Sequence, residues 1–458
     1  MTDNNYIDKN LQKGFWKGAD GVTEHTEMLS HILKTAKKEQ RSITVALLDL
    51  RNAFGEVHHN LISAALRFLH VPPELIQMLQ NIYSNNFIVV SMENRVTQPI
   101  ERVERGVLQG DPCSPLLFNL CFNTLMLTLN QPIYRKLGFS WGSRANRQER
   151  AWLQFADDAA IVASDNASAQ GLLNLFKAWC SWAGMSIRLD KCSTFGMQKR
   201  NGVYTQTMPN LSMAEGQIPA VPLNGEFTYL GRRFSFETKS EAIKTDIEQK
   251  LKKLLTFTNS LKIKAQTKIK ILSLYIHSQM LFEIKLYDLP LTWIEQSLDA
   301  LCVRYLRDWL EMPISACVSE MTSMPKKMTG LGIPTFKHLA QKLCLTKRYS
   351  LRASANADIR ELWANSSSRH VVTDQLIVSH DSVAAATKTL KADQLNSAVN
   401  HLFSLEVQGA SVKCIIDNVS SRNIEAWSST LDNLLAVFFN FARKALIQVL
   451  PTAANLKP

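Results

Sequence analysis

The sequence predicts an α+β fold, in which strands and helices are mixed as far as about residue 236 and helices follow alone. Two observations predict the strands: a pair of carboxylates, Asp157 and Asp158, between two apolar runs, and a β-branched run that ends at Asp49. The third observation is the helical character of the chain from Glu241 onward, where lysines also become frequent. These features divide the chain into a sheet-containing part and a helical part.

The paired carboxylates lie within the segment Trp152–Val162. An apolar run, a polar pair and a second apolar run predict a strand, a tight turn and a returning strand. Aspartate is depleted in strands and common in turns, so Asp157 and Asp158 belong at the tip. Two adjacent anions repel each other unless a cation neutralises them, and carboxylate oxygens suit Mg²⁺. A solvated loop is the competing interpretation.

A second acidic strand precedes this hairpin. The segment Ser42–Leu50 is β-branched and apolar, which predicts a buried strand that ends in Asp49. A charge at the end of a buried strand is costly unless it is paired or bound to a metal. Three carboxylates from two neighbouring strands can hold two metal ions, the arrangement that serves in-line phosphoryl transfer.

The composition of the chain limits its class. Its 458 residues suggest two to three domains, and 46% hydrophobic residues suffice for a sizeable core. The net charge of +12 favours a polyanionic partner, either nucleic acid or an acidic membrane surface. The 8 cysteines show no zinc spacing, so we expect free thiols. The N-terminus lacks a signal-peptide pattern, and the apolar stretch Leu431–Leu450 predicts an amphipathic helix, not a membrane span.

Elements before the paired carboxylates are assigned from periodicity and breakers. Thr23 is expected to cap a helix over Thr26–Lys38, and Ser114 with Pro115 to open a helix over Leu116–Leu129. Two helices and then a pair of strands are expected between them, over His58–His70, Pro73–Tyr83, Phe87–Met92 and Ile100–Val107.

Elements after the paired carboxylates follow the same logic. A helix over Ala167–Ala183 ends at Gly184, and a strand covers Ile187–Met197. The segment Glu226–Ser235 predicts a hairpin that turns at Gly231 and Arg232. In the helical part, eight lysines form either a solvated face or a surface that contacts nucleic-acid backbone. They are Lys244, Lys250, Lys252, Lys253, Lys262, Lys264, Lys268 and Lys270.

Five short motifs follow one another along the chain. They are Asp49-Leu-Arg-Asn-Ala-Phe54, Gln109-Gly-Asp-Pro-Cys-Ser-Pro115, Phe155-Ala-Asp-Asp158, the stretch Ser186–Phe195 around Lys191, and Tyr229-Leu-Gly231. In this order and spacing they resemble the catalytic motifs of reverse transcriptases, specifically those of non-LTR retrotransposons. Gln12-Lys-Gly-Phe15 with Glu24-His25 is similar to the family segment just upstream of the first motif. The resemblance covers roughly residues 10–335.

The resemblance implies a right-hand polymerase palm with an antiparallel sheet and partial fingers in residues 1–236. A helical thumb in 237–345 and a helical, linker-like region of unknown role in 346–458 would follow. The implied activity is RNA-directed DNA polymerase, a transferase that uses an RNA template, a DNA primer and dNTPs and needs no membrane. The family also implies a nuclear location, and a protein partner remains open.

The resemblance assigns metal chemistry to four residues. Asp49 and Asp157 would bridge two Mg²⁺ ions, with Mn²⁺ as an alternative, and Asp158 would support them. The backbone carbonyl of Leu50 would be a further ligand. Lys191 would donate a proton to the leaving pyrophosphate, although a solvated surface lysine is the competing interpretation.

The resemblance assigns substrate contacts to the remaining motifs. Phe54 would exclude a 2′-hydroxyl beneath the incoming sugar, unless it is simply a core aromatic. Gln109 would contact the nucleotide or template, and Gly110 would allow close backbone approach. The segment Tyr229, Leu230 and Gly231 would hold the primer end, with a purely structural hairpin as the alternative.

The chain also departs from the family pattern. Relatives carry earlier fingers residues that grip the triphosphate, and this chain is expected to begin after them, with Lys13 and Lys17 as candidate replacements. A catalytically impaired, nucleic-acid-binding remnant is therefore the alternative function. Another metal-dependent phosphotransferase, such as a nuclease or cyclase, is disfavoured by the loop around Gln109.

Overall fold

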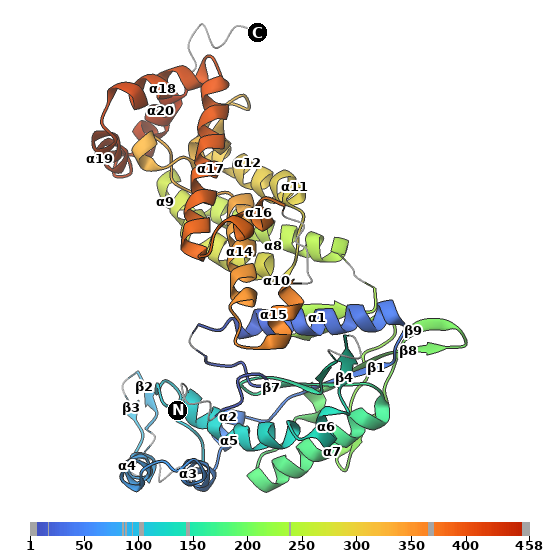
Figure 1. Ribbon diagram of the computed structural model, residues 1–458. Coiled ribbons are helices and arrows are strands. Elements are labelled where there is room, and N and C mark those ends of the chain that lie inside the picture. The colour runs from blue at the N-terminus through green and yellow to red at the C-terminus, as the bar shows by residue number, and fades with distance from the viewer. Residues whose placement is uncertain are drawn as a thin grey trace. The chain divides into compact units, whose positions relative to one another are not determined.

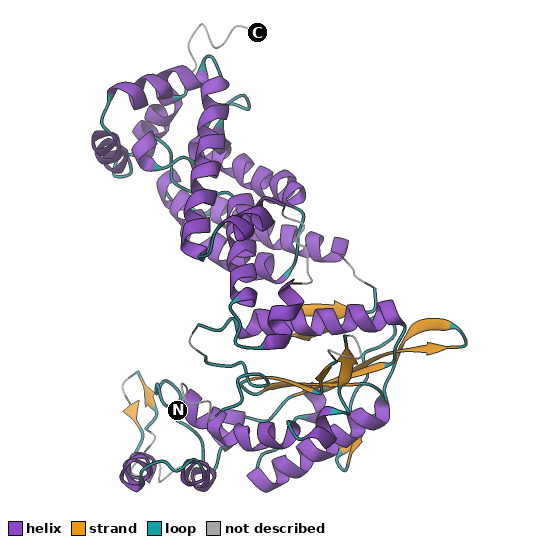
Figure 2. Ribbon diagram, viewed as in Figure 1, coloured by secondary structure: helices purple, strands orange, loops and turns teal. Residues whose placement is uncertain are grey.

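The computed structural model describes residues 7–16, 18–84, 87, 89–93, 95–99, 105–142, 147–237, 240–364 and 371–450. The chain forms two compact units (Figure 1). The first consists of residues 1–238 and 351–365, and the second of residues 239–350 and 366–458. The described part of the second unit is helical, whereas the first combines strands and helices (Figure 2). The predicted α+β fold is confirmed.

The first unit is built on a five-stranded antiparallel sheet with the strand order β6-β7-β1-β8-β9. In that order the strands are β6 (Trp152–Phe155), β7 (Asp158–Ala163), β1 (Ile43–Leu48), β8 (Ser193–Arg200) and β9 (Val203–Thr207). Both predicted acidic strands, β1 and β7, are neighbours near the centre of this sheet.

Helices cover both faces of the sheet (Figure 1). Helices α5 (Ser114–Leu129) and α7 (Asn166–Ala183) share one core with Ala46 and Leu48 of β1. Helix α1 (Gly21–Glu39) shares the other core with Val45. Because side chains alternate along a strand, burial on both faces explains why β1 is a continuous apolar run.

Shorter elements complete the first unit. They are α2 (Ala53–Glu56), α3 (His59–Phe68), α4 (Pro73–Ser84), β2 (Ser91–Met92), β3 (Arg95–Val96), α6 (Pro132–Arg135), β4 (Phe139–Trp141), β5 (Gln148–Arg150), the 3-10 turn η1 (Leu189–Lys191), β10 (Ser212–Met213), β11 (Gly216–Gln217), β12 (Glu226–Tyr229), β13 (Arg232–Ser235) and α15 (Ala357–Ala364).

The second unit has its own core, which contains Leu251 and Leu255 of its first helix. Its elements are α8 (Ser240–Ser260), α9 (Ala265–Ile271), the π-helical η2 (Leu272–Ile276), α10 (His277–Leu286), α11 (Leu291–Trp293), the π-helical η3 (Ile294–Asp299), α12 (Ala300–Trp309), α13 (Val318–Ser323), the 3-10 turn η4 (Lys326–Met328), α14 (Phe336–Arg352), which runs into the first unit, α16 (Val371–Ser379), α17 (Val383–Ser404), α18 (Gln408–Asn418), α19 (Ser421–Leu431) and α20 (Ala436–Leu446). None of the helices in the described ranges combines the length and hydrophobicity that a bilayer crossing needs.

Two predicted helix starts are wrong. Helix α1 begins at Gly21, because Asp20 is its N-cap and accepts a hydrogen bond from the backbone N–H of Thr23. Helix α5 begins at Ser114, with Cys113 at the N-cap position and no side-chain cap. The expected end of the helix over Ala167–Ala183 is confirmed, since Gly184 closes α7 with a φ of +71°.

Three predicted strand assignments also change. The expected pairing of Phe87–Met92 with Ile100–Val107 is replaced by a short hairpin of β2 with β3, and residues 100–104 lie outside the described ranges. The strand expected from Ile187 begins only at Ser193, after η1. The hairpin of β12 and β13 turns at Leu230 and Gly231, which both have positive φ, instead of at Gly231 and Arg232.

A late segment returns to the first unit. In α15, Asp358 forms an ion pair with the buried Arg150 of β5, and Ile359 is buried in the same core as α1. Residues 351–365 therefore belong to the sheet-containing first unit, although in the sequence they follow residues 239–350 of the second unit.

Candidate active site

The hairpin of β6 and β7 carries the paired carboxylates at its tip. Phe155 pairs with Asp158, so Ala156 and Asp157 form a two-residue turn. Ala156 has a φ of +53°, the left-handed conformation that tight hairpin turns use at this position. The predicted strand-turn-strand is confirmed, with Asp157 in the turn and Asp158 at the first position of β7.

Asp49 lies beside this turn through the register of β1 and β7. Leu48 pairs with Ala159, so the next residues outward, Asp49 and Asp158, are opposite each other. Alternation along the strands directs both carboxylates to the face of the sheet that carries Val45 and Ala160. Asp49 and Asp157 are each half-buried.

The three carboxylates interact electrostatically. Partial burial raises the pKa of Asp157, and the charge of Asp49 raises it further. Partial burial, Asp157 and Asp49 together raise the pKa of Asp158 to about 6. Each charge thus disfavours ionisation of its neighbours, which a cation would reverse.

A guanidinium lies next to this group. Arg188 Nε is 3.9 Å from Asp49 Oδ2, and the Arg188 side chain is 41% exposed, so the contact is weak. Arg188 also stands 3.7 Å from Asp190. The sequence motifs assign no role to Arg188. It lies near Asp49 because a β-bridge between Leu50 and Ile187 joins the two segments.

The oxygen donors suit a hard divalent cation. Around Leu50, the Arg188 N–H donates to Asp49 O and the Arg51 N–H donates to Ser186 O, both at 2.8 Å, so neither bond uses the Leu50 carbonyl. Three mutually repelling carboxylates and this carbonyl form an all-oxygen donor set. Among the residues that the structure describes, no three His, Cys, Asp or Glu side chains already converge as a metal site. The donor chemistry fits, and the carboxylates would have to turn together to hold an ion.

Phe54, five residues after Asp49, lies in an aromatic stack. Its ring is parallel to that of buried Phe118, with centroids 4.0 Å apart and an interplanar angle of 7°. Phe15 meets it edge-on at 5.9 Å. Phe54 is half-buried, so one part of the ring serves the core and another remains accessible.

The loop with Gln109 and Gly110 is anchored next to Phe54. The Val107 N–H donates to Phe54 O at 2.9 Å. Gln109 and Gly110 are exposed, and Gly110 has a φ of +96°, which favours glycine. A Cβ at Gly110 would meet no atom within 4 Å, so the backbone there is open to approach.

The other motif residues are placed differently. Lys191 is exposed at the end of η1. The ring of Tyr229 is buried, and its hydroxyl has no hydrogen-bond partner among the described residues. Burial, and then the charge of Asp158, raise the pKa of Tyr229. At the turn of this hairpin, Leu230 is half-buried and Gly231 is exposed.

One of the two candidate replacements for finger residues is not available. Lys13 is buried and forms an ion pair with buried Glu24 at 2.6 Å, so it cannot grip a triphosphate in this arrangement. Lys17 lies outside the described residues. Next to Lys13, Gln12 contacts the turn that carries Asp157, a contact that no sequence pattern signalled.

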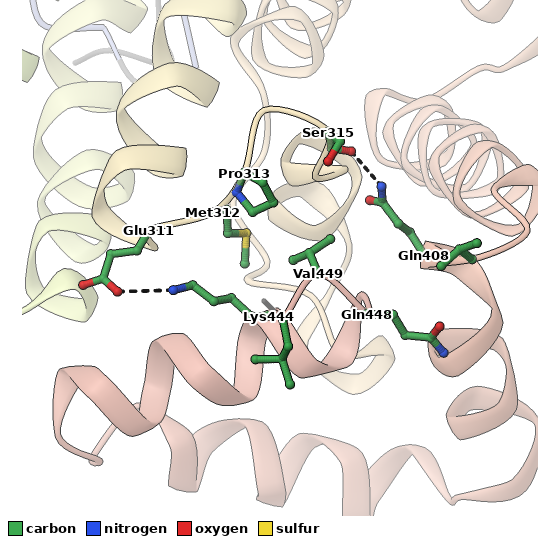
Figure 3. Close-up of a pocket in the computed structure, with 10 residues that line it drawn as sticks. Glu311, Met312, Pro313, Ser315, Gln408, Lys444, Gln448 and Val449 are labelled. Carbon is green, nitrogen blue, oxygen red and sulfur yellow. Dashed lines mark hydrogen bonds and ion pairs between the residues drawn. The ribbon is translucent and has the colours of Figure 1, made fainter. Parts of the chain in front are cut away.

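A cavity of about 460 Å³ lies in the second unit, between α18, α20 and the segment after α12 (Figure 3). An ion pair of Glu311 with Lys444, 3.2 Å long, and a hydrogen bond from Gln408 Nε2 to Ser315 O border it. None of the motif residues lines this cavity.

With this fold and these motifs, the chain belongs to the family described as reverse transcriptase (RNA-dependent DNA polymerase), whose model matches residues 4–234. The family recognised from the five motifs is confirmed. A similar relative is the Retrovirus-related Pol polyprotein from type-2 retrotransposable element R2DM of Drosophila melanogaster, 27% identical over 74% of this chain and 31% of its own length. The Pol polyprotein from type-1 retrotransposable element R2 of Nasonia vitripennis is 26% identical over 75% of this chain and 32% of its own length.

The chain spans about a third of the length of these curated relatives. Among solved structures, telomerase from Candida albicans in complex with a telomeric RNA fragment matches 80% of this chain and 52% of its own, with 9% identity and a TM-score of 0.34. Apo telomerase from Candida tropicalis matches 75% and 56%, with 11% identity and a TM-score of 0.34.

Proposed function

We propose that this chain extends a DNA primer on an RNA template, as the RNA-directed DNA polymerase of a non-LTR retrotransposon of the R2 type. The observation that supports this most is the strand register that sets Asp49 opposite Asp158, with Asp157 in the adjoining turn. Family membership and the R2 relatives support the same reaction. Because the target would be chromosomal DNA, we propose the nucleus as its place of action.

The carboxylates would hold the metal ions. Asp49 and Asp157 would hold them, the Leu50 carbonyl would add a neutral ligand, and Asp158 would support these ligands. Bound Mg²⁺ or Mn²⁺ would supply activation of the primer 3′-hydroxyl and stabilisation of the leaving pyrophosphate. In this proposal, the three carboxylates provide a concentrated negative charge, and a bound cation would relieve the repulsion among them.

The η1 segment and the residue before it carry two cations, Lys191 and Arg188. Lys191 would donate a proton to an oxygen of the leaving pyrophosphate, which its exposed position allows. Arg188, which lies 3.9 Å from Asp49, would supply positive charge near the triphosphate. Both residues would act at the rim of the site.

The nucleotide would lie between Phe54 and the loop of Gln109 and Gly110. The stack with Phe118 fixes the Phe54 ring, so a 2′-hydroxyl beneath the sugar would meet a ring that cannot swing aside. The open backbone at Gly110 would approach the nucleotide or template closely, and Gln109 would donate or accept a hydrogen bond there.

The nucleic acid would be held by two further surfaces. Leu230 and Gly231 would contact the primer end, with the buried Tyr229 anchoring their turn. We assign a helical thumb to residues 237–345 and keep 346–458 as a helical region of unknown role, apart from the returning α15. On α8 and the following segment, five exposed lysines would contact backbone phosphates. They are Lys252, Lys253, Lys262, Lys264 and Lys270.

Primer extension tests the proposal. The full chain, with Mg²⁺, a primed RNA template and dNTPs, should elongate the primer, and Asp157→Asn should abolish elongation. Asp190→Asn is the matched control. It also removes one carboxylate near Arg188, but Asp190 has no assigned role in metal binding. Absence of elongation together with retained, salt-sensitive RNA binding would favour the nucleic-acid-binding remnant.

A further inference from the structure

Two buried amides hold the backbone of Ala156, the residue immediately before Asp157. The Ala156 N–H donates to Gln12 Oε1 at 2.8 Å, and Gln12 Nε2 donates to Ala156 O at 3.1 Å. Gln154 Nε2 donates to the same carbonyl at 2.7 Å. Both glutamines are fully buried, so water does not compete for these bonds.

These bonds act on the peptide group that leads into Asp157. Ala156 has a φ of +53°, a conformation that costs a non-glycine residue free energy and persists only where its surroundings fix it. The carbonyl of Ala156 belongs to the same planar peptide as the Asp157 nitrogen. Two donors on that carbonyl therefore set the plane from which the Asp157 side chain departs.

The amide of Gln12 is itself fixed. Its Oε1 also accepts the Gly14 N–H at 2.8 Å, and its backbone carbonyl accepts the indole N–H of Trp16 at 2.8 Å. A Cβ at Gly14 would stand 2.6 Å from the Ala156 nitrogen, so only glycine lets the two segments approach this closely.

The neighbouring strand contact is fixed by His25. Its Nε2 lies 3.1 Å from Leu11 O and 2.9 Å from Gln154 O. Burial, and then the charge of Lys13, lower the pKa of His25 to about 3, so the ring is neutral and Nε2–H donates to both carbonyls. The Gln154 N–H donates to Leu11 O, and the Lys13 N–H to Gln154 O. The segment before α1 is thus bonded along β6 up to the turn.

We infer that Gln12 and Gln154 are positioning residues for Asp157: their amides hold the backbone of the turn, so that Asp157 remains beside Asp49 and Asp158 despite the repulsion among the three carboxylates. The inference rests on the proposed function, because it concerns the carboxylates that would bind metal. Neither glutamine touches the reacting atoms. Their role is to fix the backbone that carries a ligand of the ion, so that only side chains have to turn when the ion binds, as outer-sphere hydrogen bonds do in other metal sites.

The test uses Gln12→Met in the full chain, which removes the amide and keeps a similar volume. We expect the Ala156 amide hydrogen to exchange about tenfold faster in metal-free protein, because its acceptor is gone. We expect Mn²⁺ binding, measured by titration calorimetry, to weaken about tenfold. Gln154→Met removes one of the two donors to Ala156 O and should weaken Mn²⁺ binding less, in the same direction.

Gln206→Met is the matched control. Gln206 is also a buried amide of the first unit, and it clamps a backbone segment in the same manner, donating to Pro222 O at 2.9 Å and accepting the Asn224 N–H at 3.0 Å. It is expected to lose thermal stability without a change in Mn²⁺ affinity. If Gln12→Met does not fold, Gln154→Met carries the test.

Equal Mn²⁺ affinity in wild type and in a folded Gln12→Met or Gln154→Met variant would overturn the inference, as would a wild type that does not bind Mn²⁺. Hydrogen exchange and calorimetry do not require primer elongation. A chain that binds Mn²⁺ and responds to Gln12→Met but never elongates a primer would refute the polymerase proposal and leave the positioning role standing.

Discussion

Asp49 and Asp158 are opposite each other on neighbouring antiparallel strands, one residue beyond the paired Leu48 and Ala159. Two like charges at this spacing oppose each other in the metal-free protein, and Asp157 adds a third. The repulsion among these carboxylates therefore lowers the stability of the first unit, and the same charges form a concentrated anionic centre. Functional sites are often destabilising in this way.

Replacing Asp49 by asparagine should raise the melting temperature of the metal-free protein, because one of three repelling charges disappears while the weak contact with Arg188 is all that is lost. For a unit of this size, each 1 kcal/mol corresponds to roughly 2–4 °C. Calorimetry without metal checks the melting temperature, and primer elongation should be lost. Asp190→Asn should change neither, and a lower melting temperature for Asp49→Asn would contradict the repulsion.

Replacing Phe54 by alanine should admit ribonucleotides, because the ring that would meet the 2′-hydroxyl is gone. We expect the preference for dNTPs over rNTPs to fall about 10–200-fold, the range for one steric group in a pocket. Single-nucleotide incorporation kinetics with each substrate measure it. Phe54→Tyr keeps the ring and its stack with Phe118 and should keep the preference. Unchanged sugar selectivity in Phe54→Ala would leave only a core role for this residue.

Removing two exposed lysines of α8 should weaken binding to an RNA–DNA hybrid. In Lys252→Gln/Lys253→Gln the slope of log Kd against log salt should decrease by about 1–2, since each phosphate contact contributes roughly 0.7–0.9. Fluorescence anisotropy at several salt concentrations provides the slope.

The same helix supplies the control for that experiment. Lys244 bonds to Glu241 at 2.8 Å and Lys250 to Glu283 at 2.9 Å, so both ammonium groups already have partners in the protein. Lys244→Gln/Lys250→Gln removes the same formal charge and should change the slope less. Equal slopes for the two double variants would indicate a general charge effect and not specific contacts.

Lowering the pH should destabilise the first unit through His25. Burial and Lys13 lower its pKa from 6.5 to about 3 in the folded state, so below pH 6.5 the unfolded chain binds a proton that the folded chain does not. The buried, neutral His25 therefore makes its full contribution to the free energy of unfolding above pH 6.5. This contribution declines as the pH falls toward 3, by about 2 kcal/mol between pH 7 and pH 5. Urea unfolding at both values measures the decline, which His25→Gln should reduce. An identical decline in that variant would exclude His25 as its source.

The sequence predicts the carboxylates well because each lies where an apolar run stops. A charge at the end of the Ser42–Leu50 run, or within Trp152–Val162, has few physical explanations. The sequence does not predict which strands pair or in which register, and it is the register of β1 with β7 that sets Asp49 opposite Asp158.

The amide contacts of Gln12 lie beyond sequence reasoning for a different reason. A glutamine carries no periodic signal, and its partner, Ala156, is 144 residues away in the chain. Likewise, the start of α1 depends on whether Asp20 or Thr23 caps the helix, and both residue types are good caps. Leu230 at a positive φ was missed because leucine is rare in that conformation, so Gly231 and Arg232 fitted the turn better.

The packing of α15 with the first unit limits which segments of such a chain recombination can exchange. Leu351 and Ile359 are buried in the core that contains α1, although residues 239–350 intervene between them and the rest of that unit. A recombination event that exchanged everything after residue 236 would divide one folding unit between two parents. We therefore expect the helical part to be exchangeable only where the donor also supplies a fitting counterpart of residues 351–365.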